Sequence, residues 1–230
     1  MSNNKETREI WRSAEAVCFD VDSTVCRDEA IDELAKFAGV EKEVAEMTRV
    51  AMRGGCSFQE ALAQRLALIK PTQHMVEKFI TTKPLRLTPG IRELIALLHN
   101  REVDVYLVSG GFDVIIEPLA KELGIPVKNI FANRIKFFYD GSYAGFDETV
   151  PTSQSDGKAR VVALLKKLFG YKRVVMVGDG ATDLEAYPTA DAFIGFGGNQ
   201  VRETVRKEAP WFVMSFYELM AELNRNPMID

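Results

Sequence analysis

The sequence contains little cysteine: three residues in a chain of 230. They are Cys18, Cys26 and Cys56, and no two of them form a CxxC pair. An odd number cannot all pair within one chain, which excludes a small domain held together by disulfides. We therefore expect free thiols in a reducing compartment, and the cytoplasm as the location of the protein.

Long apolar runs and an excess of positive charge are also lacking. No apolar run approaches the roughly 18–20 residues of a membrane span, and residues 1–15 are too polar for a secretory signal. Lys and Arg total 29 against 33 Asp and Glu, a formal charge of −4. A pI near 5.4 provides no electrostatic footprint for nucleic acid. We expect neither a membrane nor a nucleic acid as a partner.

The overall composition is that of a globular protein. Apolar residues make up 47% and charged residues 27% of the chain, which excludes a disordered tail or a collagen-like rod. At about 100–200 residues per domain, this length suggests one large domain or one domain with an insert.

Four short apolar runs predict buried parallel strands. Each is rich in β-branched or aromatic residues and does not alternate with polar ones, as in strands covered on both faces. Helical patterns lie between them, at about 88–100, 112–123 and 158–169. The alternation predicts an α/β fold with a doubly wound, Rossmann-like parallel sheet. The runs are residues 16–19, 105–108, 174–177 and 192–194.

Two segments interrupt this alternation. Residues 28–82 carry helix signal only, including a capping box at Ser57-Phe58-Gln59-Glu60. Asp140-Gly141 separates two short runs and predicts a β-hairpin. We therefore expect an α/β core of residues 1–26 and 83–230, with a hairpin insert at about 134–148. Residues 27–82 would form a helical cap, a candidate lid.

Polar side chains follow the predicted strands. Ligands bind outside the carboxyl ends of the strands in an open parallel sheet, so these side chains should converge on one crevice. They are Asp20, Asp22, Ser109, Asp179 and Asp183. Four carboxylates repel one another, and a divalent cation that prefers oxygen ligands resolves this; Mg²⁺ is the usual choice. The less specific alternative is that these acids only cap turns and helix starts.

A phosphate site is predicted beside these acids. At a helix start, the backbone N–H groups of Gly110 and Gly111 could face an anion. A metal, backbone donors and a nearby lysine such as Lys158 together describe a phosphate site. Considered alone, Ser109 could be a plain helix cap and Lys158 a solvated side chain.

Four motifs, in this order, resemble those of the haloacid dehalogenase superfamily. They are FDVDST at 19–24, SGG at 109–111, Lys158, and GDGATD at 178–183. Within that superfamily the chain is most similar to the phosphoserine phosphatases, in residues 16–24, 145–149 and 176–183. The resemblance covers about residues 13–223, and the combination is far more specific than DxDxT or SGG alone.

The resemblance implies a Mg²⁺-dependent enzyme that hydrolyses O-phospho-L-serine to L-serine and phosphate, the last step of L-serine biosynthesis. Asp20 would be the nucleophile and form an aspartyl phosphate. Asp22 would protonate the leaving serine and then activate the water. Mg²⁺ would be held by the Asp20 side chain, the Asp22 backbone carbonyl and Asp179, with Asp183 close behind.

The same resemblance implies the residues that bind the substrate. Those for the phosphoryl oxygens are Ser109, Gly110, Gly111 and Lys158, with Thr182 near both phosphate and substrate. In the cap, Glu29 would meet the substrate ammonium and Arg65 its carboxylate, while Met52 would line the apolar side. Arg53 stands where the family usually has glycine, so its backbone N–H would serve the phosphate with the side chain pointing outward.

Three other functions remain open at this point. Another small-molecule phosphatase of the same superfamily would carry the same motifs. A signalling receiver domain also phosphorylates an Asp at a strand end, but it is about half this length and has no such helical insert. A catalytically inactive binding module is the third alternative, although every chemical position is intact. The sequence leaves the oligomeric state open, a homodimer being one state it allows.

Overall fold

The computed structural model describes residues 2–52 and 57–225. Its centre is a six-stranded sheet in the order β3-β2-β1-β6-β7-β8, and every pair of neighbours is parallel. The predicted α/β fold is therefore confirmed, and only the edge strands β3 and β8 were not predicted. The strands are β1 (Ala16–Phe19), β2 (Asp104–Phe112), β3 (Ile130–Asn133), β6 (Val174–Gly178), β7 (Ala192–Phe196) and β8 (Trp211–Val213).

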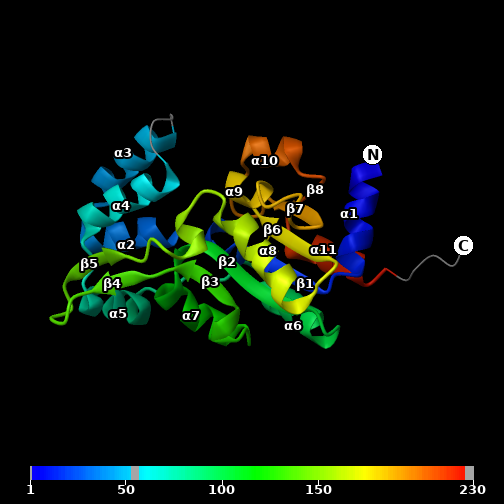
Figure 1. Cartoon of the computed structure of the whole chain (residues 1–230), viewed down its shortest axis with the longest axis horizontal. Helices are drawn as coiled ribbons and strands as arrows, with labels where there is room; N and C mark the ends of the chain where they lie inside the picture. The colour runs from blue at the N-terminus through cyan, green and yellow to red at the C-terminus, as the bar shows by residue number, and fades with distance from the viewer. Residues whose placement is uncertain (1, 53–56, 226–230) are drawn as a thin grey trace, which may run out of the picture.

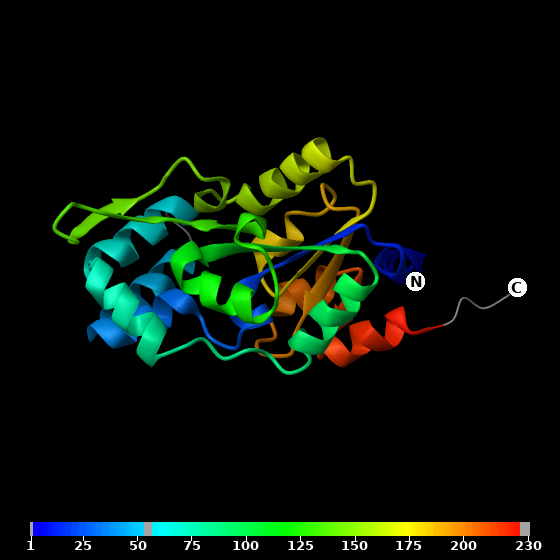
Figure 2. The ribbon, with the colours of Figure 1, turned by 90° about the horizontal axis from the view of Figure 1, so that it is seen from below.

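Helices cover both faces of this sheet (Figure 1, Figure 2). Successive side chains of a strand point to opposite faces, so Val17 and Phe19 join one apolar cluster and Ala16 and Cys18 the other. The first cluster contains side chains of α6 (Ile91–Asn100), α7 (Asp113–Glu122) and α11 (Phe216–Leu223). The second contains side chains of α8 (Gly157–Phe169), α9 (Ala181–Leu184) and α10 (Glu203–Glu208).

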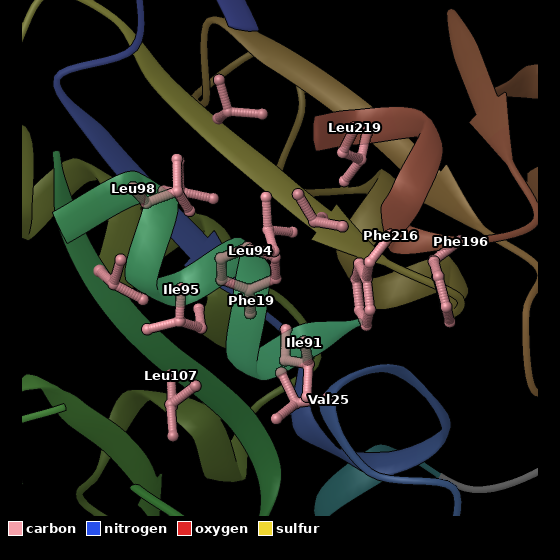
Figure 3. Packing of buried hydrophobic residues seen from close by; sticks show 14 of the residues in the cluster. Phe19, Val25, Ile91, Leu94, Ile95, Leu98, Leu107, Phe196, Phe216 and Leu219 are labelled. Atoms are coloured by element: carbon pink, nitrogen blue, oxygen red, sulfur yellow. The ribbon is translucent and has the colours of Figure 1, made fainter. Parts of the chain in front are cut away.

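Figure 3 shows the first cluster, where apolar side chains of α6 point toward Phe19 and Leu107. Helix α6 begins at Ile91, later than the position near 88 expected from the sequence, because Gly90 adopts a left-handed conformation (φ 85°) just before it. The side chain of Thr88 does not cap the helix. It donates to the Thr24 carbonyl instead (2.7 Å).

The helical insert and the hairpin lie together at one end of the molecule, and the first described helix, residues 2–12, lies at the other (Figure 1). The insert and the hairpin share an apolar cluster with Phe112 at the end of β2 and Ile115 of α7. The capping box is present as predicted, since the Ser57 hydroxyl accepts the Glu60 N–H. The elements are α2 (Ala30–Ala38), α3 (Glu41–Met52), α4 (Phe58–Ile69), α5 (Gln73–Thr82), β4 (Ile135–Phe137) and β5 (Tyr143–Phe146).

An N-terminal helix, α1 (Ser2–Arg12), was not predicted. Its Trp11 is 1% exposed, and the indole N–H donates to the Leu219 carbonyl of α11 (3.1 Å). Beside it, the buried Glu222 accepts hydrogen bonds from Arg8 (2.5 Å) and Arg12. No helix within residues 2–52 and 57–225 is long and apolar enough to cross a membrane.

Candidate active site

The predicted site residues that follow neighbouring strands lie together at one edge of the sheet. Strand β1 lies between β2 and β6, with Phe19 in register with Leu107 on one side and Val177 on the other. Asp20 follows β1 and Asp179 follows β6, so both border one cavity of about 310 Å³. The predicted site residues that line it are Asp20, Asp22, Glu29, Arg65, Gly110, Gly111, Lys158, Asp179, Thr182 and Asp183.

Lys158 is the central cation of the site. Its Nζ donates to Asp20 Oδ1 (2.7 Å) and to Asp183 Oδ1 (2.6 Å), and it is 7% exposed. Burial opposes its charge, but Asp183 and Asp20 outweigh that effect and raise the pKa of Lys158. A solvated surface lysine, the alternative left open by the sequence, is therefore wrong.

Asp22 stands on η1 (Val21–Val25), the turn that follows β1. Its Oδ1 accepts the Ala30 N–H (3.2 Å). The turn is tight enough to hold Ser23 in a left-handed conformation (φ 56°), and the Ser23 hydroxyl donates to Glu29 Oε1 (2.6 Å). Burial and the nearby Glu29 carboxylate raise the pKa of Asp22 to about 8. Asp22 can therefore carry a proton near neutral pH and release it.

Three buried carboxylates could hold a metal ion. Ligand oxygens of Asp20, Asp179 and Asp183 lie within 4.8 Å of one another. Burial and the neighbouring Asp183 raise the pKa of Asp20, because a second negative charge this close opposes its ionisation. Such a set of anionic oxygens fits a hard divalent cation, which offsets this repulsion. Asp179 is held in place by Thr24 (3.1 Å) and Arg202 (2.8 Å).

The SGG motif forms the end of β2, which continues to Phe112, beyond the run predicted at 105–108. Helix α7 begins directly after it at Asp113, so the helix predicted over about 112–123 is confirmed. Ser109 is fully buried behind the cavity wall, and its Oγ accepts the Gly111 N–H (2.9 Å). A Cβ on Gly111 would lie 3.2 Å from Asp22 Oδ2, so glycine lets this strand approach the carboxylate closely.

Two residues of the helical insert line the cavity. Glu29 precedes α2 as its N-cap residue and Arg65 belongs to α4. Thr182, on α9 of the core, lines the cavity as well. Met52 is the last residue of α3, but its side chain lies outside what the structure describes. Arg53 falls outside the described residues altogether, so the prediction for its side chain stays a prediction.

Arg202 is the charged residue of this cavity that the sequence-based prediction missed. Its Nε donates to Asp179 Oδ2 (2.8 Å) and its Nη2 to Glu29 Oε1 (3.3 Å). It lies in the loop after β7, at the same edge of the sheet as Asp20 and Asp179. Extending the strand-end rule six residues past Phe196 would have included it.

Comparisons with known proteins agree with this geometry. A family model described as haloacid dehalogenase-like hydrolase matches residues 14–191. The human protein named phosphoserine phosphatase is 56% identical over 223 residues, which cover 97% of this chain and 99% of that protein. The chain belongs to the haloacid dehalogenase-like hydrolases.

Two solved structures resemble this hydrolase over its whole fold. One is titled as a substrate-bound phosphoserine phosphatase complex, with a TM-score of 0.79, 30% identity, and coverage of 92% of this chain and 99% of that chain. The other is titled as a phospho-aspartyl intermediate analogue of phosphoserine phosphatase, with a TM-score of 0.77, 31% identity and the same coverage. Arg202 of the hydrolase lies beyond the segment that the family model matches.

Proposed function

We propose that this hydrolase cleaves O-phospho-L-serine to L-serine and phosphate. One observation carries the proposal: a single cavity is lined by a carboxylate–lysine cluster at the strand ends and also by Glu29, Arg65 and Arg202. A phosphate monoester that also bears an ammonium and a carboxylate complements both sets of side chains. The relatives that carry the phosphoserine phosphatase name support the same substrate.

The first chemical step uses Asp20 and Asp22. A carboxylate oxygen of Asp20 attacks phosphorus, and the bond from phosphorus to the serine oxygen breaks. Asp22 donates its proton to that oxygen, so serine leaves as the neutral alcohol. Asp22 suits this role because its pKa is raised to about 8. The product on the enzyme is an aspartyl phosphate at Asp20.

The second step restores the enzyme. Asp22, now a carboxylate, accepts a proton from a water molecule as that water attacks phosphorus. The bond between phosphorus and Asp20 breaks, and inorganic phosphate is released. Lys158 lies within hydrogen-bond distance of Asp20 and neutralises negative charge on the transferring group in both steps, together with Ser109 and the Gly110 N–H.

Mg²⁺ is the metal we assign to the site, with Asp20, the Asp22 carbonyl and Asp179 as ligands and Asp183 behind them. When bound, it supplies positive charge beside the phosphoryl oxygens. The donor set of buried carboxylates described above supports this assignment.

Substrate selection depends on the charged residues Glu29, Arg65 and Arg202. Glu29 binds the ammonium group, since its carboxylate lines the cavity and is held there by Ser23. Arg65 binds the carboxylate, and Arg202, which bridges Glu29 and Asp179, lies close enough to assist. Gly111, Thr182, Met52 and Arg53 complete the site as the family resemblance implies. Residues 27–82 act as the cap, and residues of about 134–148 as the smaller insert.

The wider setting is part of the same proposal. We assign the reaction to the last step of L-serine biosynthesis and the protein to the cytoplasm. The two cysteines that the structure describes, Cys18 and Cys26, are free and buried, which is compatible with a reducing compartment. The homodimer allowed by the sequence stays a prediction.

The decisive experiment measures phosphate release from O-phospho-L-serine with Mg²⁺ and with EDTA, beside a panel of other phosphomonoesters. We expect turnover with Mg²⁺, loss of turnover in EDTA, and a clear preference for phosphoserine. A general small-molecule phosphatase would instead hydrolyse the panel evenly. Turnover that persists fully in EDTA would reject the metal site.

A further inference from the structure

Gln59 links the helical insert to the segment that follows the hairpin. It is the second residue of α4, and its Nε2 donates to Glu148 Oε2 (3.0 Å). Its Oε1 accepts from Gln154 Nε2 (3.1 Å). Glu148 and Gln154 follow Gln59 by 89 and 95 residues in the sequence. Glu148 belongs to the GFDET stretch at 145–149, which has no role in the chemistry above.

The segment 148–154, which hydrogen-bonds Gln59, is itself connected to Gly110, at the end of the cavity where the phosphate is proposed to bind (the phosphate end). Ser153 Oγ donates to the Glu148 carbonyl (3.0 Å), which holds the loop in shape. The buried Thr152 donates to Asn133 Oδ1 (3.1 Å), and Asn133 donates to the Gly110 carbonyl (2.8 Å). The start of α4 is therefore connected with the SGG end of β2 through these hydrogen bonds and the short segment 148–154.

The residue before Gln59 contacts the same glycine directly. A Cβ on Gly110 would lie only 3.0 Å from Phe58 Cζ, so the ring packs against the bare backbone. Phe58 and Arg65, both on α4, line the cavity. The position of the first turn of α4 therefore decides how the insert closes over the phosphate end.

We propose that Gln59, Glu148 and Gln154 are positioning residues that hold the insert closed on the core. A glutamine side chain can donate and accept at once, and here it does both, toward two different partners. The apparent affinity for substrate falls in proportion to the closed fraction of molecules. We call the hydrogen bonds that join Gln59 to Glu148 and Gln154 the Gln59 bridge. The choice of phosphoserine as the probe rests on the proposed function, whereas the bridge itself does not.

The first test replaces Gln59 by glutamate, Gln59→Glu. The new carboxylate cannot donate and repels Glu148, although a helix N-terminus otherwise favours an acid. We expect KM for phosphoserine to rise about three- to tenfold, the effect of losing one hydrogen bond of about 1 kcal/mol, the one to Glu148, with kcat not reduced. Gln64→Glu, an exposed position of the same helix, is the matched control and should leave KM unchanged.

The second test restores the bridge with its polarity reversed. In the double variant Gln59→Glu with Glu148→Gln, the new amide at 148 donates to the new carboxylate at 59, and Gln154 still donates to it. We expect KM to return to within about twofold of wild type, because each hydrogen bond again has one donor and one acceptor. Failure of the double variant to recover would overturn the proposal, as would an equal rise of KM in Gln64→Glu.

The third measurement needs no substrate. Amide hydrogen exchange in the first turns of α4 should quicken in Gln59→Glu and recover in the double variant, while exchange in β1 stays unchanged. Unchanged exchange in α4 rejects the bridge. If wild type fails to hydrolyse phosphoserine but these exchange results hold, the proposed substrate is wrong and the bridge stands.

Discussion

At the scale of single residues, the site is governed by buried charge. Asp20, Asp179 and Asp183 are each at most 7% exposed, and the one amine that hydrogen-bonds two of them is that of Lys158. Removing carboxylates from water is costly unless cations or hydrogen bonds compensate. This explains why Lys158 is drawn fully into the site and why the three acids suit a divalent cation.

Replacement of the proposed nucleophile, Asp20→Asn, should abolish turnover while the fold is kept. An amide is nearly the size of the carboxylate but cannot form the acyl phosphate. We expect phosphate release from phosphoserine below about a tenth of wild type, a barrier increase above roughly 1.4 kcal/mol. Asp140→Asn, on the exposed hairpin turn, is the control. Activity above that level in Asp20→Asn would exclude the covalent route.

Arg65→Ala tests the substrate. Truncating one partner of a buried charge pair costs about 2–5 kcal/mol, so kcat/KM for phosphoserine should fall roughly 30-fold or more. An aryl phosphate has no carboxylate, and its hydrolysis by the same variant should barely change. The ratio of the two losses cancels general damage to the protein. Equal losses on both substrates would mean that Arg65 supports the insert and does not recognise phosphoserine.

At the scale of elements, one buried glutamate joins the first helix, α1, to the last, α11. Glu222 of α11 is 2% exposed, and it accepts hydrogen bonds from Arg8 and Arg12 of α1. Arg8 also stacks over the Trp211 ring, 4.2 Å from its centre, a favourable cation–π arrangement. Helix α1 was not predicted from its polar sequence, because its stability comes from this docking and from Trp11.

Glu222→Gln should weaken this docking in a pH-dependent way. Burial opposes ionisation, but hydrogen bonds from Arg8 and Arg12 outweigh it and lower the pKa of Glu222 below its ordinary 4.5. A lowered folded-state pKa means that the stabilisation is complete above about pH 4.5 and lost as pH falls through the folded value. We expect the variant to lose about 1–3 kcal/mol of unfolding free energy at pH 7.

Urea unfolding at pH 7 and pH 3.5 measures this difference. The gap between wild type and Glu222→Gln should narrow at the lower pH, because Glu222 of the unfolded wild-type chain then binds a proton that has to be released on folding. Glu6→Gln, at an exposed acid of α1, should show almost no loss at either pH. A gap that widens on acidification would contradict the assigned pKa direction.

At the scale of the whole molecule, the cavity lies where several separate parts of the chain meet. The turn after β1, the end of β2, the start of α8, the start of α9 after β6, the loop after β7 and the helical insert all border it. The insert and the hairpin lie together at one end of the molecule (Figure 1). A ligand that contacts two or more of these parts binds only the folded protein and therefore stabilises it.

Magnesium should raise the melting temperature for this reason. At a hundred times its Kd, a ligand that binds only the folded state adds about 2.7 kcal/mol of stability. We expect Tm to rise with Mg²⁺ concentration and to fall back in EDTA. Asp179→Asn, which removes one of the proposed anionic ligands, should shift the same rise to higher concentrations. If the Tm of wild type does not change with Mg²⁺ concentration, this result contradicts the metal site. The measurement needs no assay of activity.

The sequence by itself determined the central sheet and most of the cavity. Buried parallel strands are continuous apolar runs, and the residues that end them must lie at one edge, so Asp20, Asp179 and Gly110 could be placed together beforehand. The capping box at Ser57 was visible because its hydrogen bonds are local. The edge strands β3 and β8 were not predicted because β3 ends at a polar residue, Asn133, and β8 has only three residues.

Only the tertiary structure decided the remaining features, because they depend on contacts between distant parts of the chain. Strand β2 extends through Gly110 and Gly111 to Phe112, beyond the predicted run at 105–108, and β3 pairs with it that far. Arg202 reaches the cavity through a loop that no local pattern marks. Gln59 meets its partners only because the insert folds back onto the core, and that geometry has no signature in the order of residues.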